Sequence, residues 1–83
     1  MSRTLGSPRH KALCAFLTER RKKAGLTQAE VAKRLGRHQS FVAGFESGQR
    51  RIDVVELLDI AEAIRFDPRD AIRWIEKATS RKG

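Results

Sequence analysis

Apolar residues recur along this chain at intervals of three and four positions, which is the spacing of one face of a helix. Leu13, Phe16 and Leu17 form such a stripe in a first helix, expected over residues 9–24. Four more short segments show similar stripes, and none alternates apolar and polar residues as a strand does. The pattern therefore predicts an all-α fold of five helices.

Capping residues and glycines mark the limits of the second and third helices. Thr27 and Glu30 form a T-x-x-E capping box, so the second helix is expected to begin at Thr27. Gly36 stops that helix, His38 is the expected N-cap of the third helix, and Gly48 closes it. These signals predict two short helices separated by a tight turn.

The fourth and fifth helices have similar start signals. Asp53 and Glu56 form a second capping box, which opens a helix through Ile64. Asp67 is the expected N-cap of the fifth helix, with Pro68 at its first position. The core positions expected in the second to fifth helices are Val31, Ala32, Leu35, Val42, Phe45, Leu57, Ile60, Ala61, Ile64, Ala71, Ile72 and Ile75.

The length of 83 residues suffices for one small domain. Residues 1–8 offer little to bury and are interpreted as a flexible basic arm. Residues 79–83 are interpreted as a frayed basic tail, so the domain is expected over residues 9–78.

The chain carries 18 Lys and Arg residues against 10 Asp and Glu, a net charge of +8. This charge points to nucleic acid first, then to an anionic membrane surface, then to an acidic protein partner. Membrane binding is disfavoured, because the basic residues spread over several helices and no run approaches the ~20 apolar residues of a membrane span.

Other chemistry finds little support in the sequence. His10 and His38 lie on different segments without ligand spacing, and no C-x-x-C motif is present. Cys14 is the single cysteine and is expected to be a small buried residue. The N-terminus lacks the apolar segment of a signal peptide. We expect a cytoplasmic protein that is not an enzyme, with no catalytic residue, metal, cofactor or small-molecule ligand.

Residues 28–47 carry special residues where a helix-turn-helix needs them. Ala32 is small where the two helices cross closely, and Gly36 sits where the turn needs a positive φ angle. The wedge between the helices is expected to be filled by Leu35, Val42 and Phe45.

The stretches GLTQAEVAKRLG and HQSFVAGFESGQRR, residues 25–36 and 38–51, resemble the Cro/C1-type (Xre family) helix-turn-helix proteins. The resemblance covers roughly residues 13–76. It implies a five-helix lambda-repressor-like domain that binds operator DNA, usually as a homodimer, and regulates transcription. The same fold serves as the antitoxin half of toxin–antitoxin pairs, so a toxin-binding protein that also binds its own promoter is the alternative.

The resemblance also implies that the third helix enters the major groove of double-stranded DNA, where the N-terminal part of a helix reads bases. The amide of Gln39 can bond adenine bidentately, whereas Ser40 discriminates weakly. Phe41 either touches a thymine methyl group or sugar, or is partly buried against the second helix. The expected base-reading residues are His38, Gln39, Ser40, Ala43 and Gly44.

Ala43 and Gly44 are small where related proteins often carry long polar side chains. A glycine inside a helix costs roughly 1 kcal/mol relative to alanine. Either the helix lies deep in the groove, with Ala43 against a thymine methyl group, or readout has moved to Arg37, His38 and Gln39 or to DNA shape. Both interpretations expect Ala43 and Gly44 to face outward.

Phosphate contacts are also implied by the resemblance. Gln28 would meet a phosphate oxygen at the start of the second helix. Arg21 would bond Glu46 and face a phosphate, which orients the third helix; the alternative is two unrelated surface charges. Further phosphate contacts are expected from exposed backbone N–H groups of Ser47 and Gly48 and from the side chains of Arg37, Arg50 and Arg51.

The fifth helix offers a surface for a second copy or another protein. Ile72, Trp74 and Ile75, with neighbouring fourth-helix residues, are the expected contact, since Trp is favoured at interface centres. Alternatively, Trp74 caps the domain's own core. Besides the homodimer, a toxin or RNA polymerase is a possible protein partner.

Overall fold

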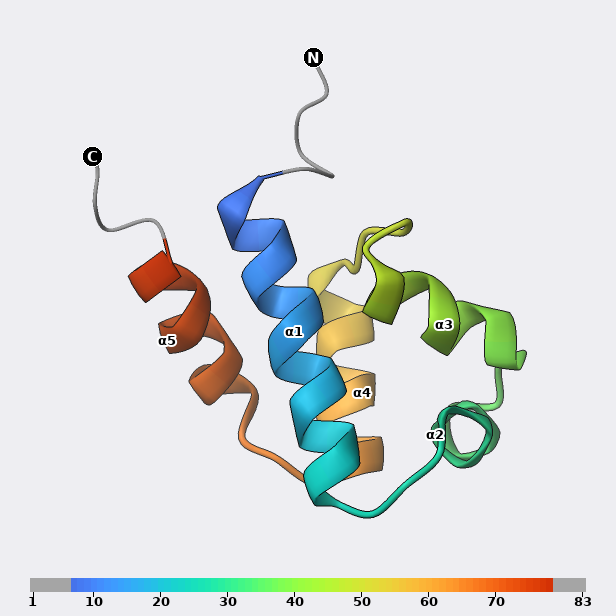
Figure 1. Ribbon diagram of the computed structural model, residues 1–83. Coiled ribbons are helices and arrows are strands. Elements are labelled where there is room, and N and C mark those ends of the chain that lie inside the picture. Colours follow the sequence, from blue (N-terminus) through green and yellow to red (C-terminus); the bar gives the residue numbers. More distant parts are fainter. Residues whose placement is uncertain (1–6, 79–83) are drawn as a thin grey trace.

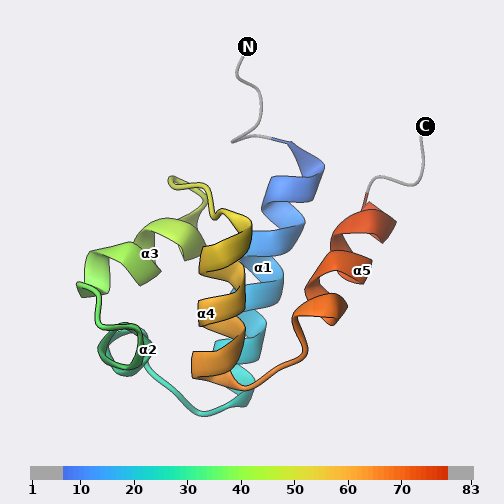
Figure 2. The ribbon, with the colours of Figure 1, turned by 180° about the vertical axis from the view of Figure 1, so that it is seen from behind.

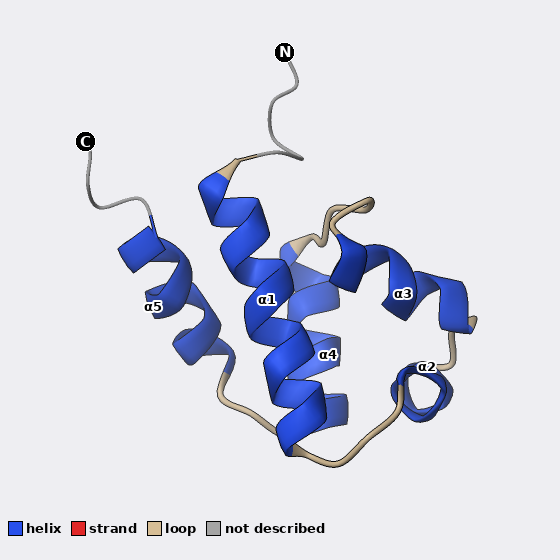
Figure 3. Ribbon diagram, in the orientation of Figure 1, coloured by secondary structure: helices blue, strands red, loops and turns tan. Residues whose placement is uncertain are grey.

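The computed structural model describes residues 7–78, which form five α-helices and no strand (Figures 1 and 3). The helices are α1 (Pro8–Lys23), α2 (Gln28–Leu35), α3 (Gln39–Ser47), α4 (Val54–Ile64) and α5 (Pro68–Ala78). The predicted all-α class is confirmed. None of these described helices has both the length and the apolar character to cross a membrane.

The start of α1 differs from its predicted position by one residue. The Ser7 hydroxyl accepts a hydrogen bond from the backbone N–H of His10 at 3.0 Å, and Pro8 occupies the first turn. Ser7 and Pro8 therefore belong to the start of the helix and not to a flexible arm. The rest of the expected arm, residues 1–6, and the expected tail, residues 79–83, lie outside the described residues.

Both predicted capping boxes are confirmed. The Thr27 hydroxyl accepts from the N–H of Glu30 at 3.0 Å, and the Glu30 carboxylate accepts from the N–H of Thr27 at 2.8 Å. The backbone hydrogen bond from Thr27 lowers the pKa of Glu30. Asp53 and Glu56 make the same reciprocal bonds, at 2.7 and 3.1 Å. Each box satisfies two N–H groups that a helix start leaves without partners.

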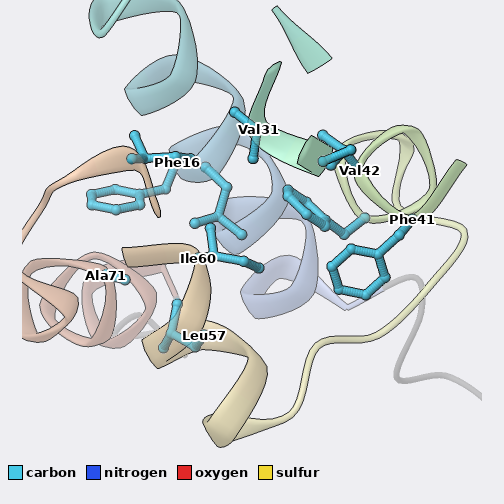
Figure 4. Packing of buried hydrophobic residues seen from close by; sticks show 11 residues of the cluster. Phe16, Val31, Phe41, Val42, Leu57, Ile60 and Ala71 are labelled. Atoms are coloured by element: carbon cyan, nitrogen blue, oxygen red, sulfur yellow. The ribbon is translucent and has the colours of Figure 1, made fainter. Parts of the chain in front are cut away.

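The core lies where the five helices meet. Helix α1 runs through the middle, with α5 on one side, α2 and α3 on the other, and α4 across its far face (Figures 1 and 2). Figure 4 shows the apolar side chains that converge there. The cluster consists of Phe16, Leu17, Val31, Ala32, Phe41, Val42, Phe45, Leu57, Ile60, Ile64 and Ala71.

The main departure from the predicted core is on α5. Ala71 is the buried residue of this helix, Ile75 is half-buried, and Ile72 is 47 % exposed, so its prediction as a core residue is wrong. Helix α5 packs mainly along α1 and makes few contacts with α4, which leaves it a narrow buried stripe. Phe41 is buried, in line with the second of its two interpretations.

Glycines occur inside α3 and at the ends of α2 and α3. The two at the helix ends have a left-handed backbone, whereas the one inside α3 is helical. Gly36 ends α2 with the positive φ predicted for it, 68°, and Gly48, predicted to close α3, does so with a φ of 86°. At Gly36 no atom lies within 4 Å of the place a Cβ would take. Gly44 lies inside α3, and its Cβ would be 3.5 Å from the Cβ of Arg50, an ordinary contact.

Substituting alanine at two of these glycines is expected to change stability in opposite directions. Gly36→Ala should lower the free energy of unfolding by about 1–2 kcal/mol, because a side chain strains a left-handed backbone even where space is open. Gly44→Ala should raise it by up to about 1 kcal/mol, since alanine suits a helix interior better than glycine. Urea unfolding of both variants measures the difference, and a less stable Gly44→Ala would contradict the contact geometry.

Candidate nucleic-acid interface

Helices α2 and α3 form the predicted helix-turn-helix, joined by residues 36–38. The start of α3 is fixed by His38, whose Nδ1 accepts the backbone N–H of Ser40 at 3.1 Å and lies 3.0 Å from its Oγ. Because Nδ1 is the acceptor, the neutral ring carries its proton on Nε2. His38 therefore caps the helix and presents a donor at its exposed end.

One side of α3 packs into the core and the other faces outward. Phe41, Val42 and Phe45 are buried. Ser40 and Ser47 are exposed and Ala43 is half-buried between them, at spacings of three and four that keep the three residues on one stripe. Gln39 and His38 are exposed at the N-terminal end of this stripe.

Gly44 does not face outward, so that part of the expectation is wrong. Its missing side chain points at the stem of Arg50, at 3.5 Å. Its carbonyl accepts from the backbone N–H groups of Gly48, Gln49 and Arg50, the latter two at 3.0 and 3.2 Å. The chain after α3 thus folds back onto the helix at Gly44.

The α1 side of α3 carries a largely buried ion pair. Arg21 donates from Nε to Oε2 of Glu46 at 2.6 Å and from Nη2 to Oε1 at 3.1 Å. The two side chains are only 13 % and 7 % exposed. Arg21 also donates to the carbonyl of Leu26 at 2.8 Å, and its hydrogen bonds with Glu46 raise its pKa. The predicted contact between Arg21 and Glu46 is therefore present, and it joins α1 to α3.

Gln28 belongs to the same group of side chains, which the sequence did not indicate. Its Nε2 donates to Oε1 of Glu46 at 2.9 Å. An amide nitrogen has two hydrogens, so one remains for a second acceptor. Glu46 thus connects α1, the first turn of α2 and the last turn of α3.

The α4 side of α3 carries a second cluster, around Phe41. The guanidinium carbons of Arg37 and Arg50 lie 3.9 and 4.6 Å from the centre of its ring. Nη2 of Arg50 donates to Oε2 of Glu56 at 2.6 Å, and Nη1 of Arg37 is 3.9 Å from the same oxygen. The ring is therefore covered by protein groups, which argues against contact with a thymine.

The phosphate clamp expected from backbone N–H groups at the end of α3 is wrong. Ser47 is the last helical residue, and Gly48 donates its N–H to Gly44 to end the helix. These donors are used within the chain because α3 closes with a left-handed glycine. The side chain of Arg51 is exposed and stays a predicted phosphate contact, whereas the side chain of Arg50 is bonded to Glu56.

His10 is a site residue that the sequence analysis missed. This buried side chain places Nε2 3.1 Å from the carbonyl of Gly48 and 3.6 Å from Sγ of Cys14, so it ties α1 to the end of α3. Its position three residues before Leu13 and four before Cys14, on the apolar stripe of α1, was the available signal. Burial raises the pKa of Cys14, which suits its expected packing role.

Within residues 7–78, no group of three or more His, Cys, Asp or Glu side chains is placed to hold a metal ion. Many basic side chains in the described part of the chain are exposed. Besides those named above, they include Lys11, Lys22, Lys23, Lys33 and Arg65. These exposed cations, which are spread over several elements, give the described surface a general attraction for a polyanion.

Comparison with known proteins identifies the domain. The family model described as "Helix-turn-helix domain" matches residues 12–79. A comparison with curated proteins found no match.

Among solved structures, an XRE-family-like protein from Pseudomonas syringae pv. tomato str. DC3000 is 45 % identical, with a TM-score of 0.79, over 86 % of this chain and 87 % of that one. The restriction-modification controller protein C.AhdI from Aeromonas hydrophila is 34 % identical, with a TM-score of 0.70, over 75 % and 94 % of the two chains.

The clp gene regulator ClgR from C. glutamicum shares the fold at 19 % identity, with a TM-score of 0.78, over 89 % and 96 % of the two chains. These likenesses point to a non-enzymatic DNA-binding protein. Together with the helix-turn-helix geometry, they show that this chain belongs to the Xre (Cro/C1-type) family of helix-turn-helix transcription regulators.

Proposed function

We propose that this protein binds a specific operator in double-stranded DNA as a homodimer, with α3 in the major groove, and thereby regulates transcription in the cytoplasm. The observation that carries the proposal is the outward stripe of α3, a helix whose N-terminal end is exposed and whose last turn is bonded to α1 through Glu46. The net charge of +8 supplies the general attraction to phosphates.

Base reading is assigned to the N-terminal end of α3. The exposed amide of Gln39 suits adenine, His38 offers an Nε2 donor, and Ser40 adds a weak contact. Ala43, on the outward stripe, suits a thymine methyl group. Because Gly44 faces the Arg50 stem, readout centred on His38 and Gln39 is favoured over a deep approach of the backbone.

Phosphate contact is assigned to Gln28 and Arg51. The Gln28 amide lies in the first turn of α2, where the positive end of the helix favours an anion. Arg51 is exposed after the end of α3. Arg21 directs three of its donors to Glu46 and Leu26, so its proposed role is to orient α3.

The proposed homodimer surface lies on α4 and α5 but differs from the one expected. Val54, Val55 and Leu58 are exposed on α4, as is Ile72 on α5. Val54 and Leu58 are four positions apart and share a face. Glu56, on the opposite face of α4, is bonded to Arg50 beside α3, so the face shared by Val54 and Leu58 lies on the other side of α4.

Trp74 is also exposed, at 51 %, but the proposed surface leaves it out. It is two positions from Ile72 on α5, a spacing that puts side chains on different sides of a helix. Its ring lies 6.3 Å from that of Phe16 on α1. Trp74 therefore adds a ring contact between α1 and α5 while about half of the residue stays exposed.

Selection of duplexes from a random library tests operator binding, and an enriched motif is the expected result. Gln39→Ala should then lower affinity for the selected duplex by about 1–3 kcal/mol and relax the preference at one position. Its affinity for random DNA should stay the same. Lys33 is exposed, so Lys33→Ala serves as the control. It should lower the affinity for the selected duplex and for random DNA by the same factor. Binding without any recurrent motif would contradict a specific operator.

Glu46→Ala is expected to lower stability and DNA affinity together. It leaves the largely buried Arg21 without its carboxylate partner; such a loss costs about 3–5 kcal/mol at a fully buried site, and a smaller loss of stability is expected here. Glu19→Ala, on the exposed side of α1, is the matched control and should change neither quantity. Thermal unfolding and binding to the selected duplex measure both effects, and unchanged values in Glu46→Ala would rule out the orienting role.

Leu58→Glu is expected to weaken the homodimer, because the added charge would be buried against the second copy. The side chain is exposed in the single chain, so the fold should be retained. Sedimentation equilibrium should show more monomer in Leu58→Glu than in wild type, and Trp74→Phe, the control, should assemble normally. If instead Trp74→Phe weakened the dimer and Leu58→Glu did not, the interface would lie on the α1–α5 side.

A further inference from the structure

Glu56 holds two arginines beside the recognition helix. Its Oε1 accepts the N–H of Asp53 at 3.1 Å in the capping box of α4. Its Oε2 accepts from Arg50 at 2.6 Å and is 3.9 Å from Arg37. The carboxylate is thereby held in place by its own helix while it faces two cations from other segments.

Those cations come from the two loops that flank α3. Arg37 lies in the turn before the helix and Arg50 in the chain after it. The buried ring of Phe41 lies under both guanidinium groups, at 3.9 and 4.6 Å, and the stem of Arg50 packs at Gly44. Phe41 and Glu56 together therefore determine where both arginines rest.

The cluster remains open to solvent on the arginine side. The side chains of Arg37 and Arg50 are 45 % and 40 % exposed, whereas that of Glu56 is 17 % exposed. A phosphate approaching the flank of α3 can reach the guanidinium groups, but it must compete with a carboxylate already in place. One anion thus reduces the attraction of two cations to DNA.

We propose that Glu56 is a positioning residue that withholds Arg37 and Arg50 from DNA phosphates and so limits sequence-independent binding. This inference rests on the proposed function. Such binding is supplied almost wholly by phosphate contacts, and each contact adds about 0.9 to the steepness of log K against log salt. With Glu56 in place, the protein makes up to two fewer such contacts than its arginines allow.

Glu56→Gln tests the proposal with a random-sequence duplex over a range of salt concentrations. Glutamine still accepts the N–H of Asp53, so the α4 cap is kept, and thermal unfolding checks this. Affinity for the random duplex should rise, and the salt dependence should steepen by about 0.9 to 1.8, for one or two freed arginines. Glu62→Gln, an exposed glutamate on the same helix, makes the same charge change and should leave the steepness unaltered.

Arg50→Gln gives a second, independent test. In the wild-type background it should leave the salt dependence unchanged, because Arg50 is bonded to Glu56. Added to Glu56→Gln, it should remove about 0.9 of the gained steepness. If Arg50→Gln alone flattens the salt dependence by about 0.9, Arg50 already binds phosphate and the proposal is wrong.

The failures of the two proposals are distinguishable. A wild-type protein that binds no duplex would overturn the proposed function itself. A wild type that binds, with Glu56→Gln behaving as Glu62→Gln does, would overturn only the role of Glu56. Weaker binding by a folded Glu56→Gln would also overturn it, since a carboxylate that merely supports Arg50 gives that result.

Discussion

The orientation of α3 in the fold depends on the largely buried ion pair between Arg21 and Glu46. Helix α3 has nine residues, too few to be stable alone, so its stability comes from packing. Apolar packing is not directional and does not by itself define how the helix is rotated. Two parallel bonds between a guanidinium and a carboxylate have a defined geometry, and the amide of Gln28 adds a third direction. The exposed end of α3 thereby keeps one orientation.

The two sides of α3 are built differently. On the α1 side the charges are largely shielded from water, so losing one partner leaves the other charge poorly compensated. On the α4 side Arg37 and Arg50 stay partly in water and share one carboxylate, so rearranging them costs less. Gly44 belongs to this second side, because the stem of Arg50 lies against α3 at this residue, at an ordinary contact distance from the place a Cβ would take. The α1 side therefore fixes α3, whereas on the α4 side the side chains of Arg37 and Arg50 can change position at low cost.

Much of the fold could be predicted because its signals act over three or four residues. The capping boxes at Thr27 and Asp53 and the left-handed glycine at Gly36 depend on backbone groups in the same turn. Two of the incorrect expectations depend on how segments pack against one another. Gly44 meets Arg50 because the chain folds back after α3, and Ile72 is exposed because α5 packs along α1. Neither packing choice can be seen in the spacing of apolar residues.

The sequence by itself determined the helices, the turn between α2 and α3 and the family, because capping, glycine geometry and motif spacing are local. The Arg21–Glu46 pair was also implied, but only through that resemblance. The tertiary structure alone decided which charges are already partnered: Gln28 with Glu46, Arg50 with Glu56, and His10 with the carbonyl of Gly48. A side chain's availability to DNA depends on its neighbours in space, and those come from helices that only folding brings together.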